Sequence, residues 1–312
     1  MHLLRLFPDD SRLDFMGQRR AAFVFTLLLA LVSIVSLSLG GLKLGLDFDG
    51  GVLVEARAAE PIRLDDLRGR LAAIGLQGVS LQTFGGEREI LIRLHAAPGS
   101  ETDPKQTVDA VKSVLGPFYE IRRSEFIGPQ VSHELLVDGI TAAFLAVLLI
   151  AVYVWFRFEW QFGLAALLTT LHDVVAVFGL FSVLRLEFDL VAVAAILTIA
   201  GYSINDTVVV FDRIRENLRR YKKMGLAELI NLSVNQTLTR TILTSGTTML
   251  AVLSLLIFGG PVLRNFSAAL AWGIAIGTYS SIFVASALLL FFPSIRLFDR
   301  SDAPDDALES GG

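Results

Sequence analysis

The chain has 312 residues, of which 53% are hydrophobic and 19% charged, and its mean hydropathy is +0.60. Soluble domains carry roughly 25% charged residues, so this excess of apolar residues indicates helices that are exposed to lipid. The mild net charge of −4 excludes an obvious nucleic-acid partner, and the lack of cysteine excludes disulfides and thiolate metal sites. No phosphate-binding glycine motif is present, so we expect no cofactor and no metal, and any energy must come from a partner or an ion gradient.

Six apolar stretches are long enough to cross a bilayer, which needs about 20 helical residues. We place them at Ala21–Gly40, Leu136–Phe156, Phe162–Leu184, Leu190–Phe211, Leu238–Phe258 and Phe266–Phe292. The first follows Arg19 and Arg20, as in a signal peptide, but its apolar run is too long and lacks a cleavage site. We expect it to be an uncleaved anchor.

Basic residues gather in the short loops on one side of the predicted membrane. They are Arg5, Arg12, Arg19, Arg20 and Arg157, the cluster between Arg213 and Lys223, and Arg296 and Arg300, against only Arg185 and Arg264 in the short loops of the other side. Because such loops stay in the cytoplasm, we expect both termini there. The cytoplasmic segments are then residues 1–20, the loop 212–236 and the tail 293–312, which we expect to be disordered. Segment 41–134 is then extracytoplasmic.

Segment 41–134 has the pattern of a folded domain. We expect a strand at Gly51–Ala58, a helix at Ile62–Ile74, a hairpin of Val79–Phe84 and Glu89–His95, a helix at Thr107–Leu115 and a last strand at Phe118–Ile127. This βαββαβ order is that of a ferredoxin-like fold. The sequence thus predicts a polytopic α-helical membrane protein whose six transmembrane helices include a five-helix bundle over 136–292. One extracytoplasmic α+β domain lies between the first and second helices, and its expected role is binding.

Ionisable side chains inside three of the predicted spans need an explanation. A charge at the bilayer centre costs roughly 2.5–3.5 kcal/mol even on a lenient scale. The third span holds His172 and Asp173 near its middle, and the fourth holds Asp206 with Tyr202 and Asn205 beside it. Local helix packing is as good an explanation for Asp173 as a functional role, because His172 is its only evident basic neighbour.

The fifth span carries Arg240, with Gln236 and Thr244 on the same face at four-residue spacing. Arg240 and Asp206 lie at similar depth on neighbouring antiparallel helices, which would bring them together. One interpretation is a buried salt bridge that only fixes helix register. The other is a polar path for protons.

An enzyme is disfavoured. Asp173 and Asp206 resemble the paired carboxylates of an intramembrane aspartyl protease, in which one acid holds the proton. The Gly-x-Gly-Asp setting typical of such enzymes is missing, since Ser203-Ile-Asn precedes Asp206. A nearby arginine would also keep both carboxylates ionised.

Several motifs together resemble the SecF family, the smaller subunits of the bacterial SecD–SecF complex. They are GLDFDGG at Gly45–Gly51, FIGP at Phe126–Pro129, RFEW at Arg157–Trp160, LHDV at Leu171–Val174, GYSIND at Gly201–Asp206, DRIREN at Asp212–Asn217, NQTLTR at Asn235–Arg240, TSGTT at Thr244–Thr248 and FGGP at Phe258–Pro261. They follow one another in order over nearly the whole chain. Asp49 departs from the pattern, because a threonine usually precedes the glycine pair, and a SecD half is absent, which implies a separate subunit.

The resemblance implies an accessory subunit of the Sec protein translocase in the bacterial inner membrane. It would use the proton-motive force, with a SecD partner, in late steps of export of an unfolded polypeptide through the SecYEG channel, together with YajC and YidC. Asp206 and Arg240 match the family's proton-conducting positions, which an aspartate of SecD completes. Asn205, Tyr202, Gln236, Thr244, Asp173 and His172 would support them. The alternatives are a non-conducting scaffold and a small-molecule exporter of the same superfamily, whose outer part is usually larger and repeated.

Overall fold

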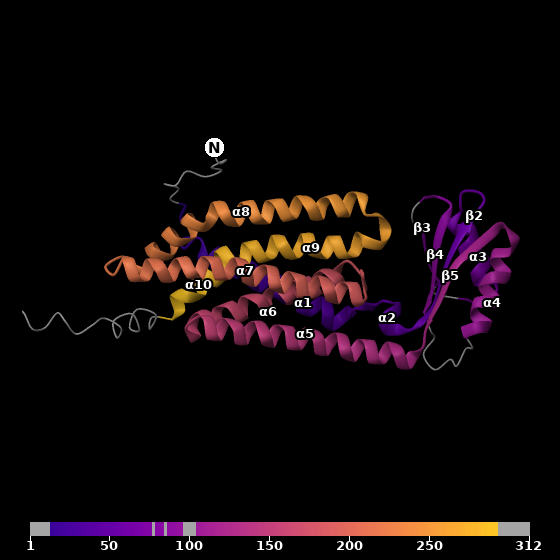
Figure 1. Ribbon diagram of the computed structural model, residues 1–312, viewed down its shortest axis with the longest axis horizontal. Helices are drawn as coiled ribbons and strands as arrows, with labels where there is room; N and C mark the ends of the chain where they lie inside the picture. Colours follow the sequence, from indigo (N-terminus) through magenta and orange to yellow (C-terminus); the bar gives the residue numbers. More distant parts are fainter. Residues whose placement is uncertain (1–12, 77–78, 84–85, 96–103, 293–312) are drawn as a thin grey trace, which may run out of the picture.

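The computed structural model describes residues 13–76, 79–83, 86–95 and 104–292. Long helices run side by side, and a small α/β domain lies at one end of them (Figure 1). Within the described residues, six helices are long and apolar enough to cross a membrane, as expected of a polytopic membrane protein. They are α1 (Arg19–Gly40), α5 (Pro129–Arg157), α6 (Trp160–Val183), α7 (Leu190–Arg220), α8 (Leu226–Phe258) and a sixth span over Val262–Phe291.

The sixth span is not a uniform α-helix. It consists of α9 (Gly260–Ser280), a π-helical stretch η2 (Ser281–Ala285), α10 (Ser286–Leu288) and the 3₁₀ turn η3 (Leu289–Phe291). Ser286 Oγ, at the start of α10, donates to the carbonyl oxygen of Ser281 at the start of η2, at 3.1 Å. Such π segments disturb the regular hydrogen-bond ladder and are frequent at functional sites.

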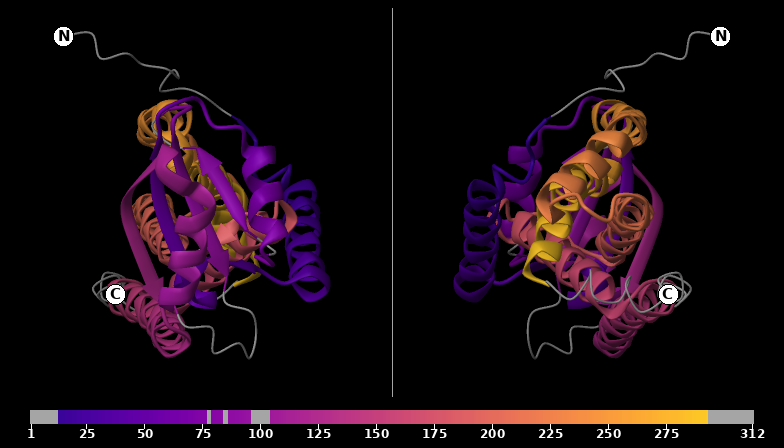
Figure 2. Two further views of the ribbon diagram at one scale, coloured as in Figure 1. Left: turned by 90° about the vertical axis from the view of Figure 1, so that its right-hand side faces the viewer. Right: turned by 90° about the vertical axis from the view of Figure 1, so that its left-hand side faces the viewer.

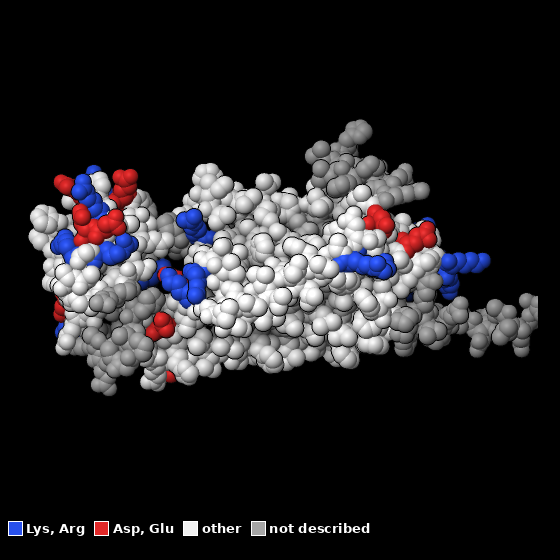
Figure 3. Space-filling view, turned by 180° about the vertical axis from the view of Figure 1, so that it is seen from behind, with Lys and Arg blue, Asp and Glu red and all other residues white. Residues whose placement is uncertain are grey.

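Three spans form the centre of the bundle. At least half of the most apolar stretch is buried in α6, in α7 and in the sixth span, whereas α1, α5 and α8 are mostly exposed. Seen along the helices, α1, α5 and α8 lie at the periphery (Figure 2). Charged side chains gather on the α/β domain and at the opposite end, and the band between them is white (Figure 3). This is the distribution that a lipid bilayer around the band requires.

The helix ends differ from the prediction. The segment 212–236, predicted as a loop, is mostly helical, because α7 continues to Arg220 and α8 begins at Leu226. Ile214, Leu218, Leu229 and Ile230 are buried there, so these polar-looking turns are amphipathic helices packed on each other. Helix α5 begins at Pro129, within the stretch predicted as domain, and proline suits a first helical position. The predicted segment 1–20 is described only from residue 13, and the predicted tail 293–312 lies outside the described residues.

The α/β domain is a four-stranded antiparallel sheet with two helices. Its elements are β2 (Gly51–Ala58), α3 (Leu64–Ala73), β3 (Ser80–Thr83), β4 (Glu89–His95), α4 (Pro104–Leu115), the 3₁₀ turn η1 (Gly116–Phe118) and β5 (Tyr119–Ile127). The strand order is β3-β4-β2-β5. Both helices lie on one face of the sheet (Figure 1). The core between them includes Val54, Ala56, Leu71, Ile90 and Val111, all with no exposed surface.

A short joint connects the domain to the bundle. Strand β1 (Lys43–Leu44) pairs in parallel with β6 (Glu187–Phe188), and a single helical turn, α2 (Leu46–Asp49), follows β1. The Asp47 carboxylate accepts a hydrogen bond from the Leu190 amide at 3.0 Å, which ties this turn to the start of α7. Phe48 packs against Phe188 with ring centroids 5.8 Å apart. The joint is therefore anchored on the bundle by both polar and apolar contacts.

Candidate functional site

Asp206 lies on α7 with 5% of its surface exposed. Its Oδ1 accepts a hydrogen bond from Thr241 Oγ1 of α8 at 3.1 Å, whereas its Oδ2 is buried and has no hydrogen-bond partner. An unpartnered carboxylate oxygen in such a site is costly unless it takes up a proton or acquires a partner. Asp206 is therefore arranged to change its charge or its contacts.

Arg240 does not pair with Asp206 in this chain. Among the residues that the structure describes, no ion pair within 4.0 Å joins them, and Arg240 is exposed on α8. One step along an α-helix turns the side chain by about 100°, so that Thr241, and not Arg240, faces α7. The direct pairing predicted from their similar depth is thus replaced by a threonine contact, and the arginine points to the outside of the bundle.

Six polar residues and one glycine continue on this outer face. These exposed residues are Thr198, Gly201 and Asn205 on α7, and Gln236, Arg240, Thr244 and Thr247 on α8. Several threonines there donate to their own helix backbone, as Thr244 Oγ1 does to the Arg240 carbonyl oxygen at 2.9 Å. The Arg240 side chain makes no such hydrogen bond within the described residues, although its charge acts on Asp206 from beyond ion-pair distance, and lipid cannot supply an acceptor. We refer to these seven residues as the polar face.

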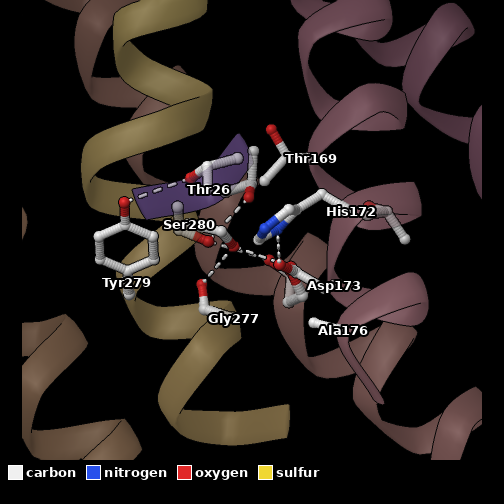
Figure 4. Close-up of polar contacts among 12 residues, drawn as sticks. Thr26, Thr169, His172, Asp173, Ala176, Gly277, Tyr279 and Ser280 are labelled. Atoms are coloured by element: carbon white, nitrogen blue, oxygen red, sulfur yellow. Dashed lines mark hydrogen bonds and ion pairs between the residues drawn. The ribbon is translucent and has the colours of Figure 1, made fainter. Parts of the chain in front are cut away.

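Asp173 on α6 forms a second acidic centre, completely buried (Figure 4). Its Oδ2 accepts from Ser203 Oγ of α7 at 2.5 Å and from Ser280 Oγ of α9 at 2.8 Å. Its Oδ1 lies 3.0 Å from His172 Nδ1, and His172 Nε2 is buried without a partner. The sequence could place His172 and Asp173 in the membrane, but not the serines of two other helices.

The π-helical stretch meets the same part of α7. Ser281 Oγ lies 2.9 Å from Thr207 Oγ1 and donates to the Ser203 carbonyl oxygen at 3.4 Å. Thr207 follows Asp206 directly, so this one hydroxyl of the sixth span contacts α7 on both sides of Asp206. Tyr202 is half-buried among apolar residues of α6, α8 and α9, and its Oη has no hydrogen-bond partner.

Gln236 lies further toward the end of the bundle opposite the α/β domain, which we call the far end. Its Oε1 accepts from Arg213 Nε at 2.7 Å and from Asn217 Nδ2 at 2.8 Å, and Asn217 also donates to Ser233 Oγ. Here the structure joins the DRIREN and NQTLTR motifs. It does not bring Gln236 into contact with Asp206.

The RFEW motif joins the same far end through two ion pairs. Arg157 lies 3.0 Å from Asp212, and Arg215 lies 3.1 Å from Glu159. The two pairs run in opposite directions, from the end of α5 to α7 and from α7 back to the turn before α6. This contact closes the α5–α6 connection against α7.

Sequence reasoning missed that residues preceding α1 pack on α8. Asn235 Nδ2 donates to the Leu13 carbonyl oxygen at 2.9 Å, and Asn235 Oδ1 accepts from the Leu13 amide at 3.1 Å. Asn231 likewise accepts from the Met16 amide at 2.9 Å. Phe15 and Met16 are buried beside these contacts. Two asparagines one turn apart on an apolar helix were the signal available in the sequence.

Asp14 completes this contact. Its Oδ1 accepts from the Gly17 amide and from Asn231 Nδ2, both at 2.8 Å. The Gly17 hydrogen bond first, and then the Asn231 hydrogen bond, lowers the pKa of the Asp14 carboxyl below its ordinary value.

Comparison with known proteins identifies the family. The family model for the C-terminal part of the SecD/SecF protein export membrane proteins matches residues 107–294. The chain is 43% identical over 301 residues to the protein translocase subunit SecF of Rickettsia conorii, covering 95% of this chain and 97% of that protein. The SecF of Rickettsia typhi is 41% identical over 301 residues.

Solved structures agree. The crystal structure of SecDF, a translocon-associated membrane protein from Thermus thermophilus, aligns with a TM-score of 0.79 and 39% identity, covering 92% of this chain. A structure of SecDF in a super-membrane-facing form aligns with a TM-score of 0.70 and 39% identity over 94% of this chain. The chain spans only 39% and 40% of those two longer chains. On its sequence and on its structure alike, the chain belongs to the SecF family of protein translocase subunits.

Proposed function

We propose that this chain is the SecF subunit of a Sec protein translocase and uses the proton-motive force in late steps of polypeptide export. It works with a SecD partner in the bacterial inner membrane, with both termini in the cytoplasm and the α/β domain outside. The strand order β3-β4-β2-β5, with both helices on one face, supports the ferredoxin-like assignment of that domain.

The observation that carries this proposal is the polar face beside Asp206. A charged guanidinium inside a bilayer costs roughly 2.5–3.5 kcal/mol at the centre, so Arg240 needs a covering chain that offers an acceptor. Asp206 is buried against Thr241, the residue that follows Arg240 on α8, and its Oδ2 has no hydrogen-bond partner. A SecD helix bearing a carboxylate fits this face, because it would neutralise Arg240 and complete the site around Asp206.

The energy available is sufficient for mechanical work. One proton crossing the membrane yields about 2.3 kcal/mol per 100 mV, which shifts a two-state equilibrium by a factor of tens. Protonation of Asp206 removes a charge from α7, and the joint at β1 and β6 connects the start of α7 to the α/β domain. Movement of α7 can therefore be transmitted to the outer domain.

The further partners follow from family membership. The Thermus thermophilus relative is described as translocon-associated. We extend this to the SecYEG channel, YajC, YidC and an exported unfolded polypeptide as partners of this chain. The chain itself is assigned no enzymatic activity.

The test uses three neutral variants in inner-membrane vesicles that contain the SecD partner. Asp206→Asn and Arg240→Met, singly and together, are compared for late-stage translocation of a preprotein, with and without an uncoupler, normalised to subunit abundance. We expect all three to lose the uncoupler-sensitive part of export, and the double variant to export no better than either single variant, because no ion pair joins these two described residues. Asp138→Asn, which removes an exposed carboxylate of α5, is the matched control and should export normally.

Full uncoupler-sensitive export by the double variant would overturn the proposal. The chain would then be a scaffold in which the two charges serve only assembly. A double variant that fails to accumulate even with SecD co-expressed would point to the same structural role.

A further inference from the structure

Asp173 and His172 form a polar cluster that the proposed function does not require. The Asp173 carboxylate receives three donors from three helices: Ser203 on α7, Ser280 on α9 and His172 beside it on α6. Each carboxylate oxygen is in contact with at least one of them, and the exposed fraction of the residue is 0%. A carboxyl group this deep in a membrane span is retained at a cost of several kcal/mol unless its surroundings stabilise it.

We propose that His172 and Asp173 are a second proton-binding site of this chain, which takes up and releases a proton during each cycle. The inference rests on the proposed function only in assigning that cycle to export. Proton binding by the pair is a property of the described geometry and can be measured without export.

The hydrogen bonds around Asp173 allow two arrangements. In the ionised form, Ser280 Oγ donates to Asp173 Oδ2 at 2.8 Å, but the same hydroxyl also lies 3.1 Å from the Gly277 carbonyl oxygen. A hydroxyl carries one proton and can donate it to only one acceptor at a time. When Asp173 is protonated on Oδ1, the acid can donate its new proton to His172 Nδ1, while Ser280 can donate either to Oδ2 or to the Gly277 carbonyl oxygen. No buried polar group then loses its partner.

His172 is the group that can exchange a proton with Asp173. Its side chain is 8% exposed, Nδ1 lies against Asp173, and Nε2 is buried and has no partner. The imidazole borders a groove of about 470 Å³ between α1 and α6, whose other lining residues are apolar apart from Thr26. A proton that binds Nε2 makes the imidazolium, which passes its Nδ1 proton to Asp173 Oδ1 and leaves a neutral imidazole carrying hydrogen on Nε2.

The position of Ser280 links the proton to a deformable part of the bundle. Ser280 is the last residue of α9, directly before the π-helical stretch Ser281–Ala285. Ser203, the other hydroxyl donor, lies one turn before Asp206 on α7. Loss or gain of charge at Asp173 therefore acts on α7, which carries Asp206, and on the end of α9.

The surrounding titratable groups are few. Helix α7 contributes Tyr202 and Asp206, and α9 contributes Tyr279, whose Oη donates to the Ala22 carbonyl oxygen at 2.8 Å and lies 3.2 Å from Thr26. Described α1 carries its ionisable residues, Arg19 and Arg20, at the far end. Helix α5 carries charges toward its two ends, and η2 and η3 have no ionisable side chain. Asp206 is thus the one other acid on the packed helix faces beside the pair.

The experiment is an infrared pH titration of the full chain, with its SecD partner, in lipid vesicles. Isotope-labelled aspartate separates the aspartic acid carbonyl stretch from that of glutamic acid. We expect a pH-dependent protonated-carboxyl band that Asp173→Asn abolishes and that Asp138→Asn and Asp206→Asn retain. His172→Gln, which keeps a polar side chain without a titratable nitrogen, should shift the midpoint of this band.

Identical titrations of Asp173→Asn and the unmodified chain would overturn the proposal. If Asp173→Asn does not accumulate, Ser280→Ala replaces it in the test, because it keeps the carboxyl group but removes one donor. Ser280→Ala must then shift the midpoint of the same band. An unchanged midpoint also overturns the proposal. The two proposals can fail separately. If the Asp173 band is present but the Asp206→Asn, Arg240→Met double variant keeps uncoupler-sensitive export, only the proposed function is refuted.

Discussion

The Arg93 guanidinium on β4 lies 2.6 Å from the Glu187 carboxylate on β6, which joins the α/β domain to the membrane bundle. The same carboxylate lies 3.0 Å from Lys43 on β1. Both the Arg93 and the Glu187 side chains are largely buried, so this contact is better shielded from solvent than an ordinary surface ion pair. Glu187 is therefore the residue through which the domain, the joint and the α6–α7 connection are held in one orientation.

We predict that Glu187→Gln loosens the domain without unfolding it. The Arg93–Glu187 coupling in a double-mutant cycle should be about 1 kcal/mol, at the upper end for partly exposed pairs. The chain has no cysteine, so a pair of introduced cysteines, one on β2 and one on α6, can carry spin labels without background. The distance distribution between them should broaden in Glu187→Gln.

Arg122→Gln is the control for this measurement. Arg122 lies 3.0 Å from Glu89, and both residues belong to the α/β domain. Removing this pair leaves the connection to the bundle intact, so the distance distribution should stay narrow. Equal broadening in both variants would mean that Glu187 does not hold the domain.

Two glycines of the domain should respond to alanine with opposite signs. Gly51 has φ of +136°, and a Cβ there would lie 2.0 Å from the Leu94 carbonyl oxygen in the neighbouring strand. Gly51→Ala should therefore lower the stability of the domain by roughly 3 kcal/mol, through overpacking and backbone strain. Gly69, exposed in α3 with open space around its Cα, should gain roughly 0.5–1 kcal/mol as alanine. Both stability changes can be measured by thermal unfolding of the purified chain, with the protease sensitivity of the domain as the signal.

Much of this fold could be predicted because its signals are local. The strands Gly51–Ala58 and Glu89–His95 have the expected bounds, since alternating residues there face the core between sheet and helices. The centres of the spans follow from apolar length alone. The ends of α7 and α8 were missed because they leave the apolar band and continue as amphipathic helices, which hydropathy does not distinguish from a loop.

The candidate site was predicted in part. The cost of placing a charge inside a membrane span singled out Asp173, Asp206 and Arg240 as residues that need an explanation. Their partners depend on how each helix is rotated about its axis, and a one-residue difference separates Thr241, which contacts Asp206, from Arg240, which does not. Ser203 and Ser280 are ordinary helix residues in the sequence, and only the packing of α6, α7 and α9 makes them ligands of Asp173.

The residues before α1 should detach from α8 when Asn235 is shortened. Asn235→Ala removes both hydrogen bonds to Leu13, and each is worth about 1 kcal/mol. We expect faster amide hydrogen exchange over residues 13–18, measured by mass spectrometry on the chain in vesicles. Gln236→Ala, at the neighbouring position but without contact to this segment, should leave the exchange unchanged.

Acid should release the same segment. The pKa of the Asp14 carboxyl is held below its ordinary value by hydrogen bonds from Gly17 and Asn231. An acid with a lowered folded-state pKa adds stability above its unfolded value, about 3.9, and loses that stability as the pH falls through the folded value. The protection factor at residues 14–17, which corrects for the intrinsic pH dependence of amide exchange, should thus be constant at neutral pH and fall only below about pH 4. Asp14→Asn, which cannot ionise, should abolish this fall.

The last prediction concerns the contact between Thr241 and Asp206. Thr241→Val keeps the shape of the side chain but removes the hydroxyl that donates to Asp206 Oδ1 at 3.1 Å. Because Oδ2 already lacks a partner, both carboxylate oxygens would then be buried without a hydrogen bond, at a cost of roughly 1–3 kcal/mol for the ionised form. The protonated acid suffers less, so the variant should favour it.

The expected result is a subunit that accumulates normally but has lost most of its uncoupler-sensitive export. Thr237→Val is the matched control, since the Thr237 hydroxyl is buried on the same helix, donates to carbonyl oxygens of that helix and does not contact Asp206. A Thr241→Ser variant keeps the donor and should restore export. If Thr241→Val exports as well as Thr237→Val, the hydroxyl has no part in holding the charge on Asp206. If Thr241→Ser fails as badly as Thr241→Val, the methyl group's packing between α7 and α8 accounts for the loss instead.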